Sequence, residues 1–378
     1  MQETHERELA AGSIGSVESD WRTRDAESRV DEAARSARKL ADKASRTLDS
    51  AKESVNAAYE RTAEKAGRVA RKARDYAQEN PGTITVGHLV GICMSPLFYA
   101  DAMGLFKDEG LNVQLKWMPN PGDAITALAS GAVQLIHNPF TNAYVAASKG
   151  APVKIIAGSG AGGLVVIAQK ATGLKTMADL KKRVGTDFTV GSQRVNTLEL
   201  TFYRNLVNHG MKYDDFKMVW FTDHFAMAAA FQQGKIDLVT HVEPYSTMLV
   251  DKSAGLSLAT NIDAWGKNAP DCVLTANADF YKKYPETTRR YLKAVLKADH
   301  AIKADTAKAV DVLDRGKYYK VDGPTLKAAL PRQMPQVDLL DAAKGMEVAI
   351  ADMVTLKYLT KVPDNVVDFT ALKDVVRG

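Results

Sequence analysis

Residues 83–118 read TITVGHLVGICMSPLFYADAMGLFKDEGLNVQLKWM. Within this stretch, 83–89 alternates as a strand does, 95–110 begins with Ser-Pro and has the apolar spacing of a helix, and 112–118 alternates again. A strand, a helix and a strand in this order are typical of a unit whose two strands lie parallel. The stretch therefore predicts an α/β protein.

The same alternation continues to a pair of successive strands, 152–158 and 164–170. A second run of strands and helices starts with FTVGS at 188–192, and the chain after residue 284 has a mainly helical pattern. Two such runs predict two α/β lobes, each with a parallel sheet that helices cover on both faces. The length of 378 residues also exceeds that of a usual single domain.

Composition limits the class of protein. The chain is 46% hydrophobic and 25% charged, with a formal net charge of +5. Its 45 acidic residues offset its 50 basic ones without a dense basic run, so we expect no nucleic-acid partner. No stretch reaches the roughly eighteen unbroken apolar residues of a membrane span. The first residues lack the features of a secretory signal, so the sequence as written predicts a cytoplasmic protein and leaves the compartment uncertain.

Residues 1–82 differ from the rest of the chain, because small apolar residues, mostly alanine, recur there at three-four spacing from Val30 to Tyr76. This pattern predicts a long amphipathic helix that ends at Asn80-Pro81-Gly82. An alanine stripe buries little area, so a solvated or disordered tail, a coiled coil and a lipid-surface helix remain alternatives. Contact with a membrane surface or a protein through residues 20–78 is a further expectation.

Gly158, Gly160 and Gly163 have the G-x-G-x-x-G spacing of a dinucleotide-binding loop. That motif needs a helix after the glycines, whereas LVVIAQK, residues 164–170, has the pattern of a strand. Glycines between two strands are typical of a tight turn or a close backbone approach. We therefore expect no NAD and no other cofactor. The chain has two cysteines, too few for a cysteine-built zinc site, although one disulfide is arithmetically possible.

Strand-to-helix junctions carry polar residues that favour anion binding. Because ligands of open α/β sheets lie beyond the carboxyl ends of strands, capped helix starts there offer N–H groups to an anion if the two lobes face each other. Ordinary helix capping is the alternative. The expected caps are Ser95-Pro96, Asn138-Pro139, Glu243-Pro244, and Asn196 with Glu199.

Three segments, 86–115, 122–136 and 237–249, carry a resemblance to a known family. Their order and spacing resemble the substrate-binding proteins of ABC importers in the nitrate, sulfonate and taurine group, and the related pyrimidine-synthase branch. The resemblance covers roughly residues 83–378. The matching positions are Gly104, Gly110, Leu111, Val113, Gly131, Gln134, Glu243, Pro244 and Tyr245.

The resemblance implies a two-lobed, periplasmic-binding-protein-like α/β fold with two crossover strands and a ligand held by hinge closure. Lobe 1 is then 83–170 with 269–378, and lobe 2 is 171–268. The crossovers are 164–170 and 268–280, and the glycine-rich turn lies at the edge of the cleft.

Carried over by position, the resemblance also implies a ligand site. Arg194 is expected to pair with a carboxylate or sulfonate, although a surface role is the alternative. Met94, Phe140 and Tyr245 suggest an apolar wall and thus an organic ligand, unless they belong to the core. The expected ligand contacts are Cys93, Met94, Ser95, Asn138, Phe140, Thr141, Ser159, Gly160, Ser192, Gln193, Arg194, Asn196, Thr197, Glu243 and Tyr245.

The function expected from this resemblance is solute binding without catalysis. The partners would be a small anionic ligand and an ABC permease, and the resemblance implies a periplasmic or membrane-associated protein. We expect no metal, because His88, His137 and His241 lack the tight spacing of ligand motifs. The alternatives are an enzyme like the thiamine-pyrimidine synthases, whose cysteine-rich iron motif is matched here by Cys93 alone, a recruited cytoplasmic ligand sensor, and a structural role for the N-terminal helix.

Overall fold

The computed structural model describes residues 81–378 apart from 267–268, 341–344 and 378, together with Glu79 and scattered positions from 32 to 67. The chain forms two compact units, Met1–Asp75 and Tyr76–Gly378. In the first unit, every described residue is helical and exposed. The rest of the predicted N-terminal helix, with its expected end at Asn80, lies outside the described residues.

The second unit contains two five-stranded sheets. The first sheet has the strand order β2-β1-β3-β10-β4, and the second has the order β7-β6-β8-β5-β9. The strands of the first sheet are β1 (Thr83–His88), β2 (Asn112–Trp117), β3 (Leu135–Pro139), β4 (Val153–Ala161) and β10 (Pro270–Asn277). Those of the second are β5 (Leu164–Gln169), β6 (Thr189–Ser192), β7 (Lys217–Trp220), β8 (Leu238–Val242) and β9 (Gly255–Thr260).

Both sheets are mixed, which corrects the expectation of parallel sheets. In the first sheet β1 pairs parallel with β2 and β3, but β10 is antiparallel to β3 and β4. In the second sheet β6 pairs parallel with β7 and β8, but β5 is antiparallel to β8 and β9. The physical reason is that the chain enters one sheet from the other at β5 and at β10. These two strands are therefore not connected through a helix to a preceding strand of the same sheet, which is the connection that makes neighbouring strands parallel.

The chain passes between the sheets twice. The first passage lies between β4 and β5, at Gly162 and Gly163, which both have a left-handed backbone with φ of 74°. This point precedes residue 170, where the resemblance placed the end of lobe 1, and β5 pairs with strands of the second sheet. The return passage lies between β9 and β10.

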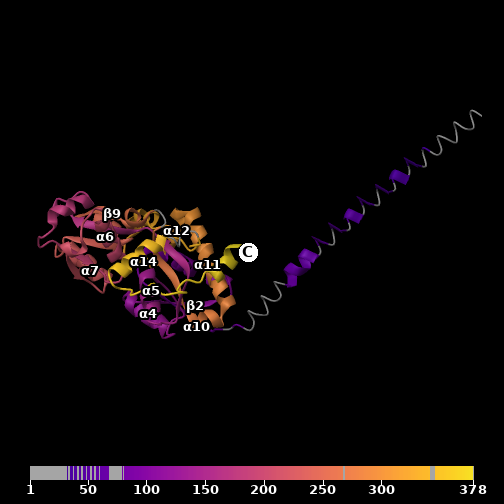
Figure 1. The fold of residues 1–378 in the computed structure, drawn as a ribbon, viewed down its shortest axis with the longest axis horizontal. Coiled ribbons are helices and arrows are strands. Elements are labelled where there is room, and N and C mark those ends of the chain that lie inside the picture. The colour runs from indigo at the N-terminus through magenta and orange to yellow at the C-terminus, as the bar shows by residue number, and fades with distance from the viewer. Residues whose placement is uncertain are drawn as a thin grey trace, which may run out of the picture. The chain divides into compact units, whose positions relative to one another are not determined.

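Helices surround both sheets (Figure 1). In this view α6, α7 and β9 lie at one end of the larger unit, α10, α11 and β2 lie at the other, and α5 and α14 lie between them. The α-helices with the first sheet's strands are α2 (Ser95–Ala102), α3 (Leu105–Asp108), α4 (Pro121–Ala129) and α5 (Phe140–Ser148). Those between β6 and β10 are α6 (Thr197–Asn208), α7 (His224–Gln232), α8 (Tyr245–Asp251) and α9 (Asn261–Trp265). The C-terminal ones are α10 (Ala278–Lys283), α11 (Pro285–Ala304), α12 (Thr306–Arg315), α13 (Gly323–Ala329), α14 (Gly345–Thr355) and α15 (Thr370–Arg377).

Short 3-10 helices complete the larger unit: η1 (Ile92–Met94), η2 (Lys170–Thr172), η3 (Met177–Arg183), η4 (Tyr213–Asp215) and η5 (Leu330–Arg332). Each sheet has its own apolar core. Phe98 and Tyr291 are fully buried in the cluster on the first sheet, and Phe202 and Phe231 are fully buried in two clusters on the second. No helix among the described residues has both the length and the apolar composition that a membrane span requires.

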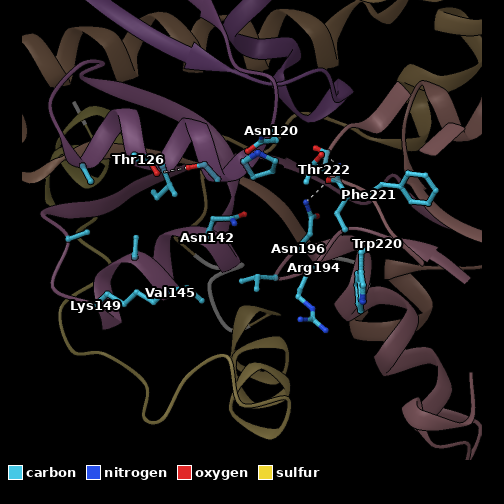
Figure 2. Close-up of a pocket in the computed structure, with 18 residues that line it drawn as sticks. Asn120, Thr126, Asn142, Val145, Lys149, Arg194, Asn196, Trp220, Phe221 and Thr222 are labelled. Carbon is cyan, nitrogen blue, oxygen red and sulfur yellow. Dashed lines mark hydrogen bonds between the residues drawn. The ribbon is translucent and has the colours of Figure 1, made fainter. Parts of the chain in front are cut away.

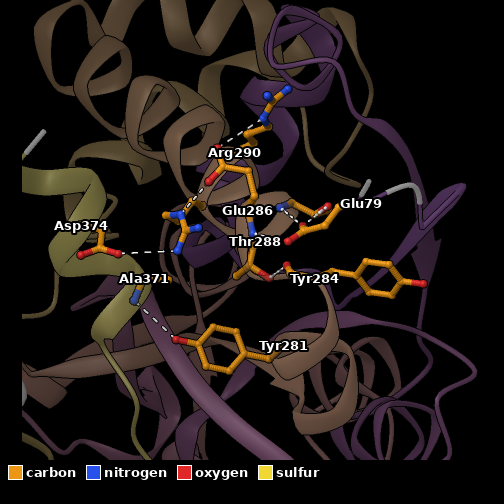
Figure 3. Close-up of polar contacts among 10 residues, drawn as sticks. Glu79, Tyr281, Tyr284, Glu286, Thr288, Arg290, Ala371 and Asp374 are labelled. Atoms are coloured by element: carbon orange, nitrogen blue, oxygen red, sulfur yellow. Dashed lines mark hydrogen bonds and ion pairs between the residues drawn. The ribbon is translucent and has the colours of Figure 1, made fainter. Parts of the chain in front are cut away.

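Glu79 attaches the segment before β1 to the start of α11 (Figure 3). Its carboxylate accepts hydrogen bonds from the backbone N–H groups of Glu286 and Thr287, at 3.2 and 2.9 Å, and from the Thr287 hydroxyl at 3.1 Å. A carboxylate at this position binds N–H groups that lack partners within the helix. The larger unit therefore uses a contact that lies before residue 83.

Candidate functional site

A pocket of about 730 Å³ lies where elements of the two sheets meet (Figure 2). One wall comes from α4 and α5, which follow strands of the first sheet, and the other comes from the segments after β6 and β7 of the second sheet. We call this the outer pocket. Its lining residues are Asn120, Pro121, Gly122, Ile125, Thr126, Ala129, Asn142, Val145, Ala146, Lys149, Ala151, Gln193, Arg194, Val195, Asn196, Trp220, Phe221 and Thr222.

Two cations are the only charged side chains among these lining residues. Arg194 lies on the wall formed by the second sheet, and its guanidinium carbon is 4.7 Å from the centre of the Trp220 ring. Lys149 lies across the pocket, at the end of α5 (Figure 2). Because no lining residue is acidic, the outer pocket favours a negatively charged ligand.

Hydrogen bonds connect the loops on the second wall. Asn196 accepts from the backbone N–H of Leu198 at 3.1 Å, and thus caps α6, while its side-chain amide donates to Gln193 at 3.0 Å. Gln193 in turn donates to the carbonyl of Thr222 at 3.3 Å. The loops that carry Arg194 and Trp220 are therefore held together.

A second, much smaller cavity shares Asn196 with the outer pocket. Its volume is about 20 Å³, and it is lined by residues of both sheets, among them Cys93, Asn196, His224 and Cys272. We call this region the inner floor. A volume of this size holds about one water molecule. The inner floor therefore has no space for an organic ligand in this state.

Gln333, which follows η5, binds two residues of the inner floor, Cys93 and Asp271. Its side chain is fully buried, accepts from the backbone N–H of Cys93 at 3.1 Å, and donates to the carbonyl of Gly162 and to Asp271, at 3.0 and 2.9 Å. Asp271 also accepts from the Thr197 hydroxyl at 2.7 Å, at the start of α6. One buried network thus joins the first sheet, the second sheet and the C-terminal segment.

Burial shifts the pKa values of three ionisable side chains that lie at or next to the inner floor. Loss of solvent raises the pKa of Asp271 and of Glu243, and hydrogen bonds from Thr197 and Thr247 respectively oppose this rise. Loss of solvent also lowers the pKa of His224 to about 3. Burial thus favours the uncharged form of all three groups.

The structure divides the predicted site residues into two groups. Gln193, Arg194 and Asn196 line the outer pocket, and Cys93 and Met94 line the inner cavity with Asn196. The remaining ten are buried and line neither space: Ser95, Asn138, Phe140, Thr141, Ser159, Gly160, Ser192, Thr197, Glu243 and Tyr245. Contact between these ten residues and a ligand stays a prediction that requires the cleft to open.

The expected helix caps are correct at two of four positions. Asn196 caps α6, and Glu243 accepts from the backbone N–H of Thr247 at 3.0 Å in the first turn of α8. Ser95 is itself the first residue of α2, and its hydroxyl has no hydrogen-bond partner within the described part of the chain. Asn138 instead accepts from the Thr275 hydroxyl of β10 at 2.8 Å, because β10 inserts beside β3.

Sequence reasoning missed most of the outer pocket, including Asn120, Asn142, Lys149 and Trp220. Asn120 offered one signal, because it precedes Pro121 and caps α4 by accepting from the Asp123 N–H at 2.8 Å. Trp220 offered another, as an aromatic residue at the carboxyl end of a predicted strand.

A model of the NMT1-like family matches residues 77–314, and the chain belongs to this family. The chain is 27% identical over 233 residues to the 4-amino-5-hydroxymethyl-2-methylpyrimidine phosphate synthase THI13 of Saccharomyces cerevisiae. That alignment covers 57% of this chain and 64% of the yeast protein, so the chain matches less than two thirds of the relative's length.

Solved structures share the fold at low sequence identity. The ligand-binding component of an ABC-type import system from Staphylococcus aureus, with zinc bound, has a TM-score of 0.70 and 17% identity, covering 78% of this chain and 99% of that one. The alkanesulfonate-binding protein SsuA from Xanthomonas axonopodis pv. citri, bound to MOPS, has a TM-score of 0.65 and 16% identity, covering 77% and 99%. The predicted two-lobed fold of the ABC-importer binding proteins is thereby confirmed.

Proposed function

We propose that this chain is a substrate-binding protein that takes one small organic anion into the outer pocket and delivers it to an ABC permease. The observation that carries this proposal is the charge of the pocket: both sheets contribute to its walls, and Arg194 and Lys149 are its only charged lining residues. A ligand that touches both walls stabilises the arrangement in which the walls are close, which is the requirement for hinge closure.

The size and lining of the outer pocket favour an organic body on the anion. A volume of about 730 Å³ lies within the range of small-molecule sites. Apolar groups of Ile125, Val145 and Phe221 face the space, and Trp220 offers a flat ring. Bare nitrate would leave these groups without a partner. An alkyl or aryl sulfonate or carboxylate would cover them, and the Xanthomonas relative bound to MOPS is an example of such a ligand in this fold.

A panel of ligands tests this proposal by isothermal titration calorimetry. We expect at least one alkyl or aryl sulfonate or carboxylate to bind, and the uncharged alcohol or amide of the same body to bind far more weakly. Nitrate tests the contribution of the organic body. Binding of the neutral compound as tightly as the anion would contradict the proposal, as would a complete lack of binding across the panel when the protein is folded.

A second candidate, an enzyme like the yeast synthases, is favoured by the 27% identity to THI13. The pyrimidine-synthase branch of the resemblance also implies contacts to pyridoxal phosphate, and enzymes that use this cofactor hold it as a Schiff base on a lysine amine. Lys149 is the one lysine that lines the outer pocket, and it is exposed at the end of α5, so the described pocket residues do not fit that cofactor. The absorbance spectrum of protein loaded with pyridoxal phosphate distinguishes the candidates, because a Schiff base at the cleft would support the enzyme.

A further inference from the structure

Cys93 and Cys272 lie together at the inner floor, although 178 residues separate them in the sequence. We propose that these two residues are a modification site, where oxidation forms a disulfide that fastens η1 to strand β10. The bond would fix the loop that follows the first strand to the strand by which the chain returns from the second sheet. This inference is independent of the proposed ligand.

The distance between the two sulfur atoms favours a disulfide. Both thiols are free in the structure, and their Sγ atoms are 2.6 Å apart. Nonbonded heavy atoms prefer a separation of about 3.5 Å or more. A disulfide needs about 2.05 Å. The thiols are therefore much closer than ordinary packing requires.

A metal ion fits the same distance less well. Asp271 lies beside the thiols, and ligand atoms of all three residues lie within 4.8 Å of one another. Two thiolates on one zinc ion would lie about 3.8 Å apart, given Zn–S bonds of about 2.3 Å at a tetrahedral angle. The sulfur atoms would have to separate by about 1.2 Å to bind zinc, but need to approach by only about half of that to form a disulfide.

Hydrogen bonds hold the backbone of Cys93 in the position that brings the two sulfur atoms together. Its N–H donates to Gln333 at 3.1 Å, and its carbonyl accepts from the Ser159 hydroxyl at 2.6 Å. Gly160 pairs with Cys272 across the sheet, and a Cβ added to Gly160 would lie 2.5 Å from the Cα of Cys93. Glycine at this position thus lets η1 lie directly on the sheet, beside Cys272.

The oxidant for this reaction is a small-molecule disulfide, such as glutathione disulfide. One protein thiolate attacks it and releases one glutathione thiol. The second protein thiolate then attacks the mixed disulfide and releases the other, so that the protein loses two protons and two electrons. Burial raises the pKa of the Cys93 thiol to about 12 and raises that of Cys272 well above its usual range. Oxidation is therefore expected to be slow in the folded, closed protein and faster during refolding.

Thiol counting on the full chain tests the proposal, because these are the only two cysteines. The protein is unfolded in denaturant, refolded in a glutathione redox buffer at pH 8 until its thiol content is constant, quenched with acid, and alkylated with N-ethylmaleimide under denaturing conditions. We expect a monomer without alkylation and with a mass lower by two hydrogen atoms. Dithiothreitol before the quench should restore two alkylated thiols.

Variants that keep both cysteines test whether disulfide formation depends on the proximity of the two sulfur atoms or only on the general reactivity of the thiols. Gly160→Ala is expected to lower the equilibrium ratio of disulfide to dithiol by about tenfold or more, since it displaces Cys93. If this variant does not fold, Ser159→Ala, which frees the Cys93 carbonyl and also removes a partner of the His137 ring, should lower the ratio by a smaller factor. Gly173→Ala is the control for a glycine replacement away from the thiols, because no atom of the described residues, apart from its chain neighbours, lies within 4 Å of a Cβ there.

Four results would overturn the proposal. These are two alkylated thiols after refolding in oxidising buffer, glutathione adducts on separate cysteines, disulfide-linked dimers, and thiols that stay reduced because one equivalent of zinc is bound and is removed by a chelator.

Discussion

Replacement of Arg194 by alanine should weaken binding of an anionic ligand while the fold stays intact. The guanidinium lies at the wall of the outer pocket, 4.7 Å from the Trp220 ring, and no acidic residue lines the same space. Arg194 therefore supplies positive charge to a space with no acidic lining residue, although the carboxyl group of Glu199 behind the wall interacts with it electrostatically. We choose the sulfonate or carboxylate that binds tightest in the panel as the probe.

The expected size of this effect follows from the exposure of the side chain. A hydrogen bond to a charged group contributes about 1.5–3 kcal/mol when it is well protected. Arg194 is exposed, so we take the lower half of this range, about 1.5–2 kcal/mol, or roughly a tenfold to thirtyfold increase in Kd. Stacking on Trp220 adds little directly, about 0.5–1 kcal/mol at an exposed site, but it orients the guanidinium toward the pocket.

Calorimetry at two salt concentrations isolates the contribution of the Arg194 charge to the affinity for the ligand. The affinity of the unaltered protein should fall as salt rises, because mobile ions screen exposed charges over about 10 Å at 0.1 M. Arg194→Ala should bind more weakly at low salt and should respond less to added salt. Arg194→Lys keeps the charge without the planar group, so it should keep most of the salt response. An Arg194→Ala protein with unchanged Kd and unchanged salt response would refute the assignment of the anion to the outer pocket.

Three further predictions concern stability and are measured by urea unfolding. Glu79→Ala should lose about 1–2 kcal/mol because it uncaps α11, and Glu79→Gln should lose less since one acceptor oxygen remains; equal losses would contradict the cap. His137 has a pKa of about 3 when folded against an ordinary 6.5, so its stabilising contribution is complete above pH 6.5 and falls by about 1.4 kcal/mol per pH unit toward pH 3. The unaltered protein should therefore lose stability faster than His137→Gln as pH falls below 6, and parallel curves would refute this. Gly163 and Gly173 have similar φ angles of 74° and 69°, but a Cβ would overlap the Gln333 side chain only at Gly163, so Gly163→Ala should cost about 1–3 kcal/mol more than Gly173→Ala. Equal costs would show that Gln333 moves aside freely.

The elements of the fold followed from hydrophobic periodicity, because that pattern is local. The predicted strand at 83–89 is β1, the predicted strand at 112–118 is β2, and FTVGS contains β6. The order of the strands within each sheet does not follow from a local sequence pattern. The antiparallel positions of β5 and β10 depend on how the chain passes between the sheets. Strand β9 was not predicted, although the capping box of Thr260 and Asp263 marks the start of α9 directly after it.

The candidate site was harder to predict, because its position depends on what fills the space between the sheets. The resemblance placed contacts on loops after the strands, and Arg194 and Asn196 do line the outer pocket. No pattern near those loops indicated that Gln333, far along the chain, would bind residues of the inner floor. The proximity of Cys93 and Cys272 was equally unpredictable, since spacing in sequence says nothing of it.

The glycines at 158–163 connect these observations. Each one permits a different close approach: a Cβ would meet the carbonyl of Gln336 at Gly158, Cys93 at Gly160, and the side chain of Gln333 at Gly163. The glycines thus permit close packing against the protein's own chain, whereas the resemblance had implied that this turn admits a ligand at the edge of the cleft. Because this packing closes the inner floor, a ligand that binds without opening the cleft is restricted to the outer pocket. There the exposed cation of Arg194, and not the buried residues below it, would determine which anions are taken.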